Sequence, residues 1–161
     1  MAGGKRQIFM GDGHGKSAAA LGMAMREAAM GGRVVVIQFL KASNLIESSF
    51  TEKLEPEIKF FRFERSDNDY LERSRHEQEE DAVNMRNGLG FARKVLSTGM
   101  CDLLVLDEIL EVINKGIVSI DELREAVRDR GETDIIITGC DMDMGICDFA
   151  DDITQIRPMN R

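Results

Sequence analysis

The stretch IFMGDGHGKSAAALGMAMREA, residues 8–28, decides how the rest of the sequence is interpreted. Apolar residues that suit a strand lead directly into a glycine-rich turn, and the turn leads into an alanine- and methionine-rich segment typical of a helix. Gly11, Gly13 and Gly15 alternate through the turn, so its backbone can bring N–H groups close to an anion. The N-terminus of the following helix favours negative charge as well. The stretch therefore predicts a phosphate-binding loop that needs no net positive charge on the protein.

Two side chains at the end of the turn suit a nucleotide triphosphate. Lys16 can reach phosphate oxygens, and the hydroxyl of Ser17 suits Mg²⁺. The spacing is G-x-x-x-G-K-S, one residue shorter than the strict P-loop pattern, which would place a glycine at Met10. The alternative is a plain glycine-rich turn in which Gly-Lys-Ser is accidental. The candidate nucleotide-binding residues are Gly11, Asp12, Gly13, His14, Gly15, Lys16, Ser17 and Ala18.

A dinucleotide-binding turn fits the same residues less well. Its G-x-G-x-x-G pattern fails because Lys16 stands where the third glycine belongs. The next predicted strand ends in QFLK, residues 38–41, without the acidic residue that would bind a ribose hydroxyl. We therefore set this class of site aside.

A second motif, LLVLDE at residues 103–108, supplies carboxylates. Four apolar residues followed by Asp107 and Glu108 are typical of a buried strand whose acids lie at its carboxyl end, beside the phosphate loop. Mg²⁺ prefers oxygen ligands and often takes one or two carboxylates together with phosphate oxygens. The alternative is a buried strand that happens to end in two solvated acids. The candidate metal ligands are Ser17, Asp107 and Glu108.

Strand-like and helix-like segments alternate along the whole chain. The predicted strands are 6–10, 33–40, 58–63, 103–107, 134–138 and 153–156, and several are apolar throughout, as in parallel strands covered on both faces. The predicted helices are 16–30, 45–54, 73–97, 109–115, 120–129 and 144–150. Ser119 stands three residues before Glu122, which predicts a capping box at the start of one of them. The pattern predicts a single domain, residues 1–161, with a three-layer α/β fold of the P-loop, RecA-like type and a mostly parallel sheet.

Composition excludes other classes of protein. Hydrophobic residues make up 43% and charged residues 31% of the 161, which excludes a wholly disordered chain. A net charge of −8 without a basic stripe argues against nucleic-acid binding, and no apolar run approaches the ~20 residues of a membrane helix. An odd count of 3 cysteines at no zinc-like spacing, with no signal-like N-terminus, favours a reducing cytoplasm.

Taken in order, these motifs resemble the P-loop type of ATP:corrinoid adenosyltransferase. That family's loop typically reads GNGKGKTT, with the same shortened spacing as GDGHGKSA at residues 11–18. The further matches are QFLK at 38–41, LDE at 106–108, ITG at 137–139 and ADDIT at 150–154. The resemblance implies a reaction in which a Co(I) corrinoid attacks the C5′ carbon of Mg·ATP and triphosphate leaves. It also implies a possible homodimer whose substrates are small molecules, and a site in which no side chain acts as nucleophile.

The sequence departs from the family pattern at several positions. His14 replaces a lysine, Ala18 a hydroxyl residue and Cys140 an arginine. The family's Gly-Phe-x-Trp segment has no counterpart in residues 66–71, and relatives usually continue about fifteen residues beyond Arg161. These departures predict slow corrinoid turnover with ordinary ATP binding. Two alternatives therefore stay open: an ATP-binding regulatory or pseudoenzyme relative, and a small-molecule kinase or ATPase.

Overall fold

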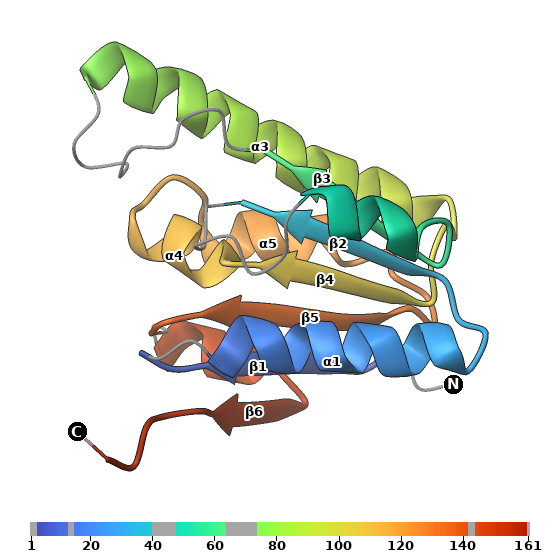
Figure 1. Ribbon diagram of the computed structural model, residues 1–161. Helices are drawn as coiled ribbons and strands as arrows, with labels where there is room; N and C mark the ends of the chain where they lie inside the picture. The colour runs from blue at the N-terminus through green and yellow to red at the C-terminus, as the bar shows by residue number, and fades with distance from the viewer. Residues whose placement is uncertain (1–2, 13–14, 40–47, 64–73, 142–143, 161) are drawn as a thin grey trace.

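The computed structural model describes residues 3–12, 15–39, 48–63, 74–141 and 144–160. Its centre is a six-stranded sheet with the strand order β3-β2-β4-β5-β1-β6 (Figure 1). Every strand pairing is parallel. The strands are β1 (Arg6–Met10), β2 (Val34–Gln38), β3 (Ile58–Arg62), β4 (Leu103–Asp107), β5 (Asp134–Gly139) and β6 (Asp152–Gln155). Because all strands run the same way, their carboxyl ends share one edge of the sheet, and the candidate site residues that follow them gather there.

Helices cover both faces of the sheet and bury an apolar layer on each. They are α1 (Gly15–Ala29), α2 (Ser48–Thr51), α3 (Arg75–Ser97), α4 (Ile109–Asn114) and α5 (Ile120–Ala126), with 3₁₀ helices η1 (Glu52–Leu54) and η3 (Met144–Phe149). Ala20 and Ala24 of α1 pack on one face, and their small side chains let the helix lie close to the strands. Met85, Ala92 and other residues of α3 pack on the opposite face with residues of α4 and α5. The three-layer α/β fold with a parallel sheet is thus confirmed.

The predicted elements are present, with differences at their ends. Predicted strand 33–40 is shorter in the structure, where β2 ends at Gln38. Predicted helix 45–54 is divided into α2 and the 3₁₀ helix η1, and residues 45–47 lie outside the described part. Predicted helix 144–150 is the six-residue 3₁₀ helix η3. Short helical runs tighten easily to 3₁₀ geometry because so few α-helical hydrogen bonds would be lost.

Capping boxes begin two of the helices. Ser119 accepts a hydrogen bond from the backbone of Glu122, and the Glu122 carboxylate accepts one from the backbone of Ser119, which confirms the prediction for α5. Ser74 and Glu77 form the same arrangement at the start of α3. None of the described helices has the length and apolar composition that a membrane crossing requires.

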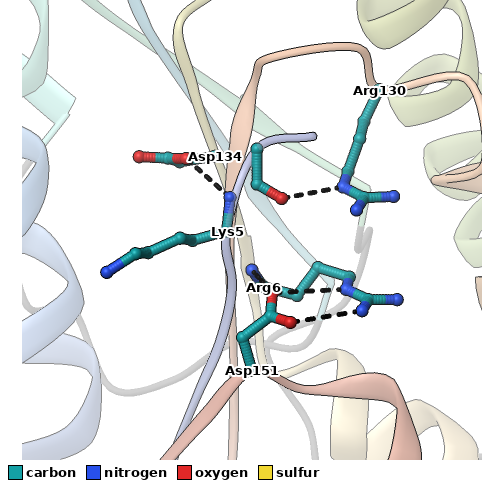
Figure 2. Close-up of polar contacts among 6 residues, drawn as sticks. Lys5, Arg6, Arg130, Asp134 and Asp151 are labelled. Atoms are coloured by element: carbon teal, nitrogen blue, oxygen red, sulfur yellow. Dashed lines mark hydrogen bonds and ion pairs between the residues drawn. The ribbon is translucent and has the colours of Figure 1, made fainter. Parts of the chain in front are cut away.

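The amino ends of the strands are tied together by side chains on β1 and its neighbours (Figure 2). The Lys5 amide donates to Asp134 Oδ1 at 2.7 Å, and the Arg6 amide donates to Asp151 Oδ2 at 2.8 Å. The Arg6 guanidinium also pairs with Asp151 at 3.3 Å, and Arg130 Nε donates to the Gly4 carbonyl at 3.1 Å. These bonds anchor β1 against β5 and β6 at one edge, so that the glycine-rich loop at its other end starts from a firmly placed strand.

Candidate active site

The candidate site lies where β1, β4 and β5 end. The strand β5 separates β1 from β4 in the sheet, so the glycine-rich loop after β1 is not next to the acids after β4 through strand pairing. Instead, Lys16 and Ser17 in the first turn of α1 approach Asp107 and Glu108 at the end of β4. All four side chains are buried, with between 3% and 7% of each residue exposed. Burial weakens solvent screening, so the contacts among them are stronger than those of surface groups.

Ser17 and Asp107 are joined directly. The Ser17 hydroxyl donates to Asp107 Oδ1 at 2.8 Å. The hydroxyl of Thr138, in β5, donates to the same oxygen at 2.7 Å. Among the described residues, both hydrogen bonds to this carboxylate fall on Oδ1, so Oδ2 is left to bind another group.

Lys16 contacts the second acid. Its Nζ lies 3.4 Å from Glu108 Oε1 and 3.5 Å from Cys140 Sγ. Burial lowers the pKa of Lys16, but the neighbouring Glu108 carboxylate and Cys140 sulfur together raise it more, and the net pKa lies above the ordinary value. The ammonium group is therefore charged at neutral pH, as phosphate binding requires.

Glu108 has an unusual backbone conformation. Its φ is 65° and its ψ is 17°, in the left-handed region that few residues other than glycine adopt. Burial raises the pKa of this carboxyl, Lys16 lowers it and Asp107 raises it again, with a net increase. Adjacent acids of one strand thus have different partners, Asp107 on the serine side and Glu108 on the lysine side.

The remaining predicted loop residues are placed as follows. Gly11 is buried, and its amide donates to the Gly139 carbonyl at 3.1 Å. A Cβ at Gly11 would collide with the Ile156 carbonyl, so the close approach of the chain just after β6 requires glycine here. Asp12 and Ala18 are exposed, and Gly15 begins α1. Gly13 and His14 lie outside the described residues, as do residues 66–71.

The loop after β5 is held by α4. The Cys140 amide donates to Glu111 Oε1 at 3.1 Å, and the Asn114 side chain donates to the Asp141 carbonyl at 3.1 Å. Potential ligand atoms of Glu108, Glu111 and Cys140 lie within 4.8 Å of one another. A cavity of about 660 Å³ opens beside Gly11 and Cys140, and the C-terminal residues Gln155 and Arg157 also line it. The start of the glycine-rich loop therefore borders an open space at the carboxyl edge of the sheet.

Sequence reasoning left two groups of polar residues unassigned. The sequence pattern includes Thr138 only within ITG at 137–139, although a lone hydroxyl in an apolar strand indicates a buried polar contact. Gln38 and Arg62 end β2 and β3 in register with Asp107, and Arg62 Nε donates to Gln38 Oε1 at 2.8 Å. Both line a small pocket with Ser17 and Asp107. Strand order brings these residues into one row, and strand order was not predictable from local patterns.

The donor set fits Mg²⁺. Ser17 and Asp107 offer a hydroxyl and a carboxylate oxygen, both hard ligands, from groups already in contact. A small number of protein ligands suits Mg²⁺, because this ion keeps several waters and binds phosphate oxygens. Glu108, by contrast, is paired with Lys16.

Comparison with solved structures supports the fold. The crystal structure of the flagellar accessory protein FlaH from Methanocaldococcus jannaschii aligns with a TM-score of 0.57 and 16% sequence identity, over 96% of this chain and 71% of that one. This similarity concerns the architecture.

Comparison with curated sequences is more specific. The corrinoid adenosyltransferase of Escherichia coli K12 is 28% identical over 153 residues, which cover 94% of this chain and 76% of that protein. The corrinoid adenosyltransferase CobA of Salmonella typhimurium is 28% identical over 159 residues, with the same coverage. The corrinoid adenosyltransferase of Pseudomonas aeruginosa is 25% identical and covers 92% of this chain and 72% of its own.

The sequence profile of one family spans almost the whole chain. That family is described as ATP:corrinoid adenosyltransferase BtuR/CobO/CobP, and it matches residues 3–161. Over the same residues the structure has a parallel α/β sheet and brings Lys16 and Ser17 against Asp107 and Glu108. This chain belongs to the ATP:corrinoid adenosyltransferase family.

Proposed function

We propose that this corrinoid adenosyltransferase holds the triphosphate of ATP between Lys16, Ser17 and Asp107 and presents C5′ of the nucleoside to a Co(I) corrinoid. The reaction class follows from the family: the 5′-deoxyadenosyl group of ATP moves to the corrinoid. The residue assignment rests on two contacts among buried side chains. Lys16 pairs with Glu108, and Ser17 donates a hydrogen bond to Asp107. A lysine and a carboxylate-bound serine at a helix N-terminus form a site for a phosphate chain with its metal.

The bonds that form and break in this reaction do not include a bond to a protein side chain. The cobalt electron pair forms a bond to C5′, the bond from C5′ to the phosphate oxygen breaks, and triphosphate leaves with the electrons of that bond. No side chain has to act as nucleophile, because the reduced corrinoid supplies one. The side chains have to position C5′ and stabilise the negative charge that gathers on the departing oxygen.

Lys16 is the residue best placed for that charge. Its ammonium group is buried and held by Glu108 at 3.4 Å, so it is available near the loop with little rotamer freedom left to lose. Preorganised charge in a site of low dielectric is worth more than the same charge in water. We assign Lys16 to the triphosphate.

Ser17 and Asp107 would hold Mg²⁺, whereas Glu108, the acid next to Asp107, contacts Lys16. The ion neutralises phosphate charge and thereby makes triphosphate a better leaving group. Ser17 contributes its hydroxyl oxygen and Asp107 its carboxylate. Glu108 orients Lys16.

The test is the Mg²⁺ dependence of ATP binding and of adenosyl transfer in an Asp107→Asn variant. We expect the dependence on Mg²⁺ to be largely lost and transfer to fall by roughly 100-fold, since a ligand and its charge are removed. The matched control is Asp102→Asn, because Asp102 stands just before the amino end of β4 and pairs with Arg33 on the surface. Full Mg²⁺-dependent binding and transfer in Asp107→Asn would contradict the assignment.

Location and assembly stay predictions. A cytoplasmic site of action suits a reaction that needs a strongly reduced cobalt, and the free cysteines at 101, 140 and 147 are compatible with it. A homodimer is the assembly that the family resemblance suggests.

A further inference from the structure

Thr138 stands out among the buried residues that the assigned chemistry does not use. It is 0% exposed, and it follows three isoleucines in β5. The strand ladder pairs Thr138 with Phe9 of β1 and places it one step beyond the pair Leu106–Ile137. A hydroxyl in such a position costs stability unless it is hydrogen-bonded, and valine would fill the same volume.

The hydroxyl makes two bonds, one to each of the adjacent acidic residues. It donates its proton to Asp107 Oδ1 at 2.7 Å and accepts the backbone N–H of Glu108 at 2.9 Å. A hydroxyl has one proton, so the directions of both bonds are determined. Thr138 and Ser17 both donate to Oδ1, so neither bond uses Oδ2 of Asp107.

The second bond concerns the shape of the chain at Glu108. This residue has φ of 65° without being glycine, a conformation that costs about 1 kcal/mol or more. The hydrogen bond that its amide donates to the buried Thr138 hydroxyl helps to hold that conformation. In it, the carboxylate of Glu108 lies 3.4 Å from Lys16 Nζ. A single hydroxyl thus links the metal-side acid to the lysine-side acid.

We propose that Thr138 is a positioning residue, which sets the Asp107 carboxylate for Mg²⁺ and the Glu108 backbone for the contact with Lys16. This inference rests on the proposed function, because it needs Mg·ATP at these residues. It differs from a packing role in a measurable way: it requires the hydroxyl, whereas packing requires only the volume.

The decisive variants are Thr138→Val, which keeps the shape and removes the hydroxyl, and Thr138→Ser, which keeps the hydroxyl. We expect Thr138→Val to weaken the Mg²⁺ dependence of ATP binding by roughly tenfold or more in calorimetry, since partners of metal ligands typically contribute 10- to 100-fold. The kcat/KM for ATP should fall at least as much, while KM for the corrinoid stays constant. Thr138→Ser should return both quantities to within about threefold of the wild type.

The matched control is Thr133→Val. Thr133 is a second buried threonine, and its hydroxyl donates to the Cys101 carbonyl at 2.9 Å on the far edge of the sheet. Its loss should lower stability as much as the loss of the Thr138 hydroxyl does and leave Mg²⁺ and ATP binding unchanged. Adding Thr138→Val to Asp107→Asn should produce little further loss of Mg²⁺ dependence, because the carboxylate that the hydroxyl orients is already gone.

The outcomes distinguish a failure of this inference from a failure of the proposed function. A wild-type protein without Mg²⁺-dependent ATP binding overturns both. A wild-type protein that binds Mg·ATP, with a folded Thr138→Val variant that binds equally well, overturns the role of Thr138 alone. Parallel losses in the Thr138→Val and Thr133→Val variants, following stability, also overturn it. Should Thr138→Val fail to fold, Thr138→Ser compared with Thr138→Ala tests the hydroxyl, since both lack the methyl group and only serine keeps the hydroxyl.

Discussion

Lys16 shows how much one buried charge depends on its partner. Its ammonium group would be costly to bury alone, and the carboxylate of Glu108 at 3.4 Å offsets that cost. The exposed thiol of Cys140 lies at 3.5 Å on another side. The lysine is therefore charged, enclosed and directed to the edge where the phosphate loop begins.

Replacing Lys16 by alanine should weaken ATP binding about ten- to a hundredfold, because one charge-assisted hydrogen bond contributes roughly 1.5–3 kcal/mol. Calorimetric titration with Mg·ATP measures the change. Lys94→Ala, on the exposed side of α3, serves as control and should bind as the wild type does. Unchanged affinity in a folded Lys16→Ala protein would refute the phosphate assignment.

Single residues were predictable where a local pattern carries its own chemistry. The Gly-Lys-Ser turn and the Asp-Glu pair each occupy consecutive positions, and they come together in the structure at 2.8 Å and 3.4 Å. The separate partners of Asp107 and Glu108 were not predictable, because they follow from the left-handed backbone at Glu108. The amide of that residue donates to Thr138 in β5, thirty positions further along the chain.

At the scale of elements, α3 offers a test of packing in two nearby glycines. Gly88 is buried against aromatic rings: a Cβ there would lie 2.8 Å from Phe63 Cγ and 2.9 Å from Phe39 Cε1. Gly90 is exposed, with nothing within 4 Å of the corresponding position. The two positions share a helix and differ only in their surroundings.

Gly90→Ala should stabilise the protein by about 0.5–1 kcal/mol, since alanine is the better helix former. Gly88→Ala should instead destabilise it by about 1–2 kcal/mol, because overpacking outweighs the same gain in propensity. Urea unfolding measures the free energy of unfolding of both variants, and the comparison requires that its slope against urea concentration is the same in each. Equal stabilisation by both substitutions would show that α3 does not pack closely on Phe39 and Phe63.

The capping box of α5 predicts a dependence on pH. The hydrogen bond from the Ser119 amide and the neighbouring Arg86 lower the pKa of Glu122 below its ordinary 4.5. A carboxyl with a lowered folded pKa stabilises the fold above its unfolded pKa, and this stabilisation is lost as the pH falls through the folded value. Glu122→Gln should therefore cost up to about 1 kcal/mol at pH 7 and clearly less near pH 3.

Unfolding of Glu122→Gln at both pH values measures this difference. Glu132→Gln, at an exposed position in the turn before β5, is the control and should show little cost at either pH. A cost for Glu122→Gln that does not change between pH 7 and pH 3 would exclude a role for the carboxylate charge.

Elements were predicted well where burial dictates composition. β1 and β4 begin and end at the predicted residues, and β4, which is buried at every position, is apolar up to Asp107 as expected of a strand covered on both faces. The end of α5 was predicted three residues too late, because Val127 leaves the helical conformation at its C-cap while the residues after it still suit a helix. Local composition does not specify where tertiary contacts end a helix.

For the whole molecule, the class of fold followed from the alternation of strands and helices, but the strand order did not. Placement of β5 between β1 and β4 comes from the tertiary structure, and it brings Thr138 between the phosphate loop and the acids. The same order aligns Arg62, Gln38 and Asp107 in one row across three strands. One edge of the sheet thus carries the side chains that we propose for triphosphate and metal, above a core of apolar residues on both faces.

The most direct measurement identifies the products formed from Mg·ATP and a chemically reduced corrinoid with the unmodified protein. We predict one triphosphate released for each adenosylcorrinoid formed, without ADP, since the bond that breaks joins C5′ to the phosphate chain. ADP released while the corrinoid stays unchanged would indicate phosphoryl transfer or hydrolysis and contradict the assignment. Binding of Mg·ATP without any adenosylcorrinoid would contradict it equally, because the site would then hold the nucleotide without catalysing the transfer.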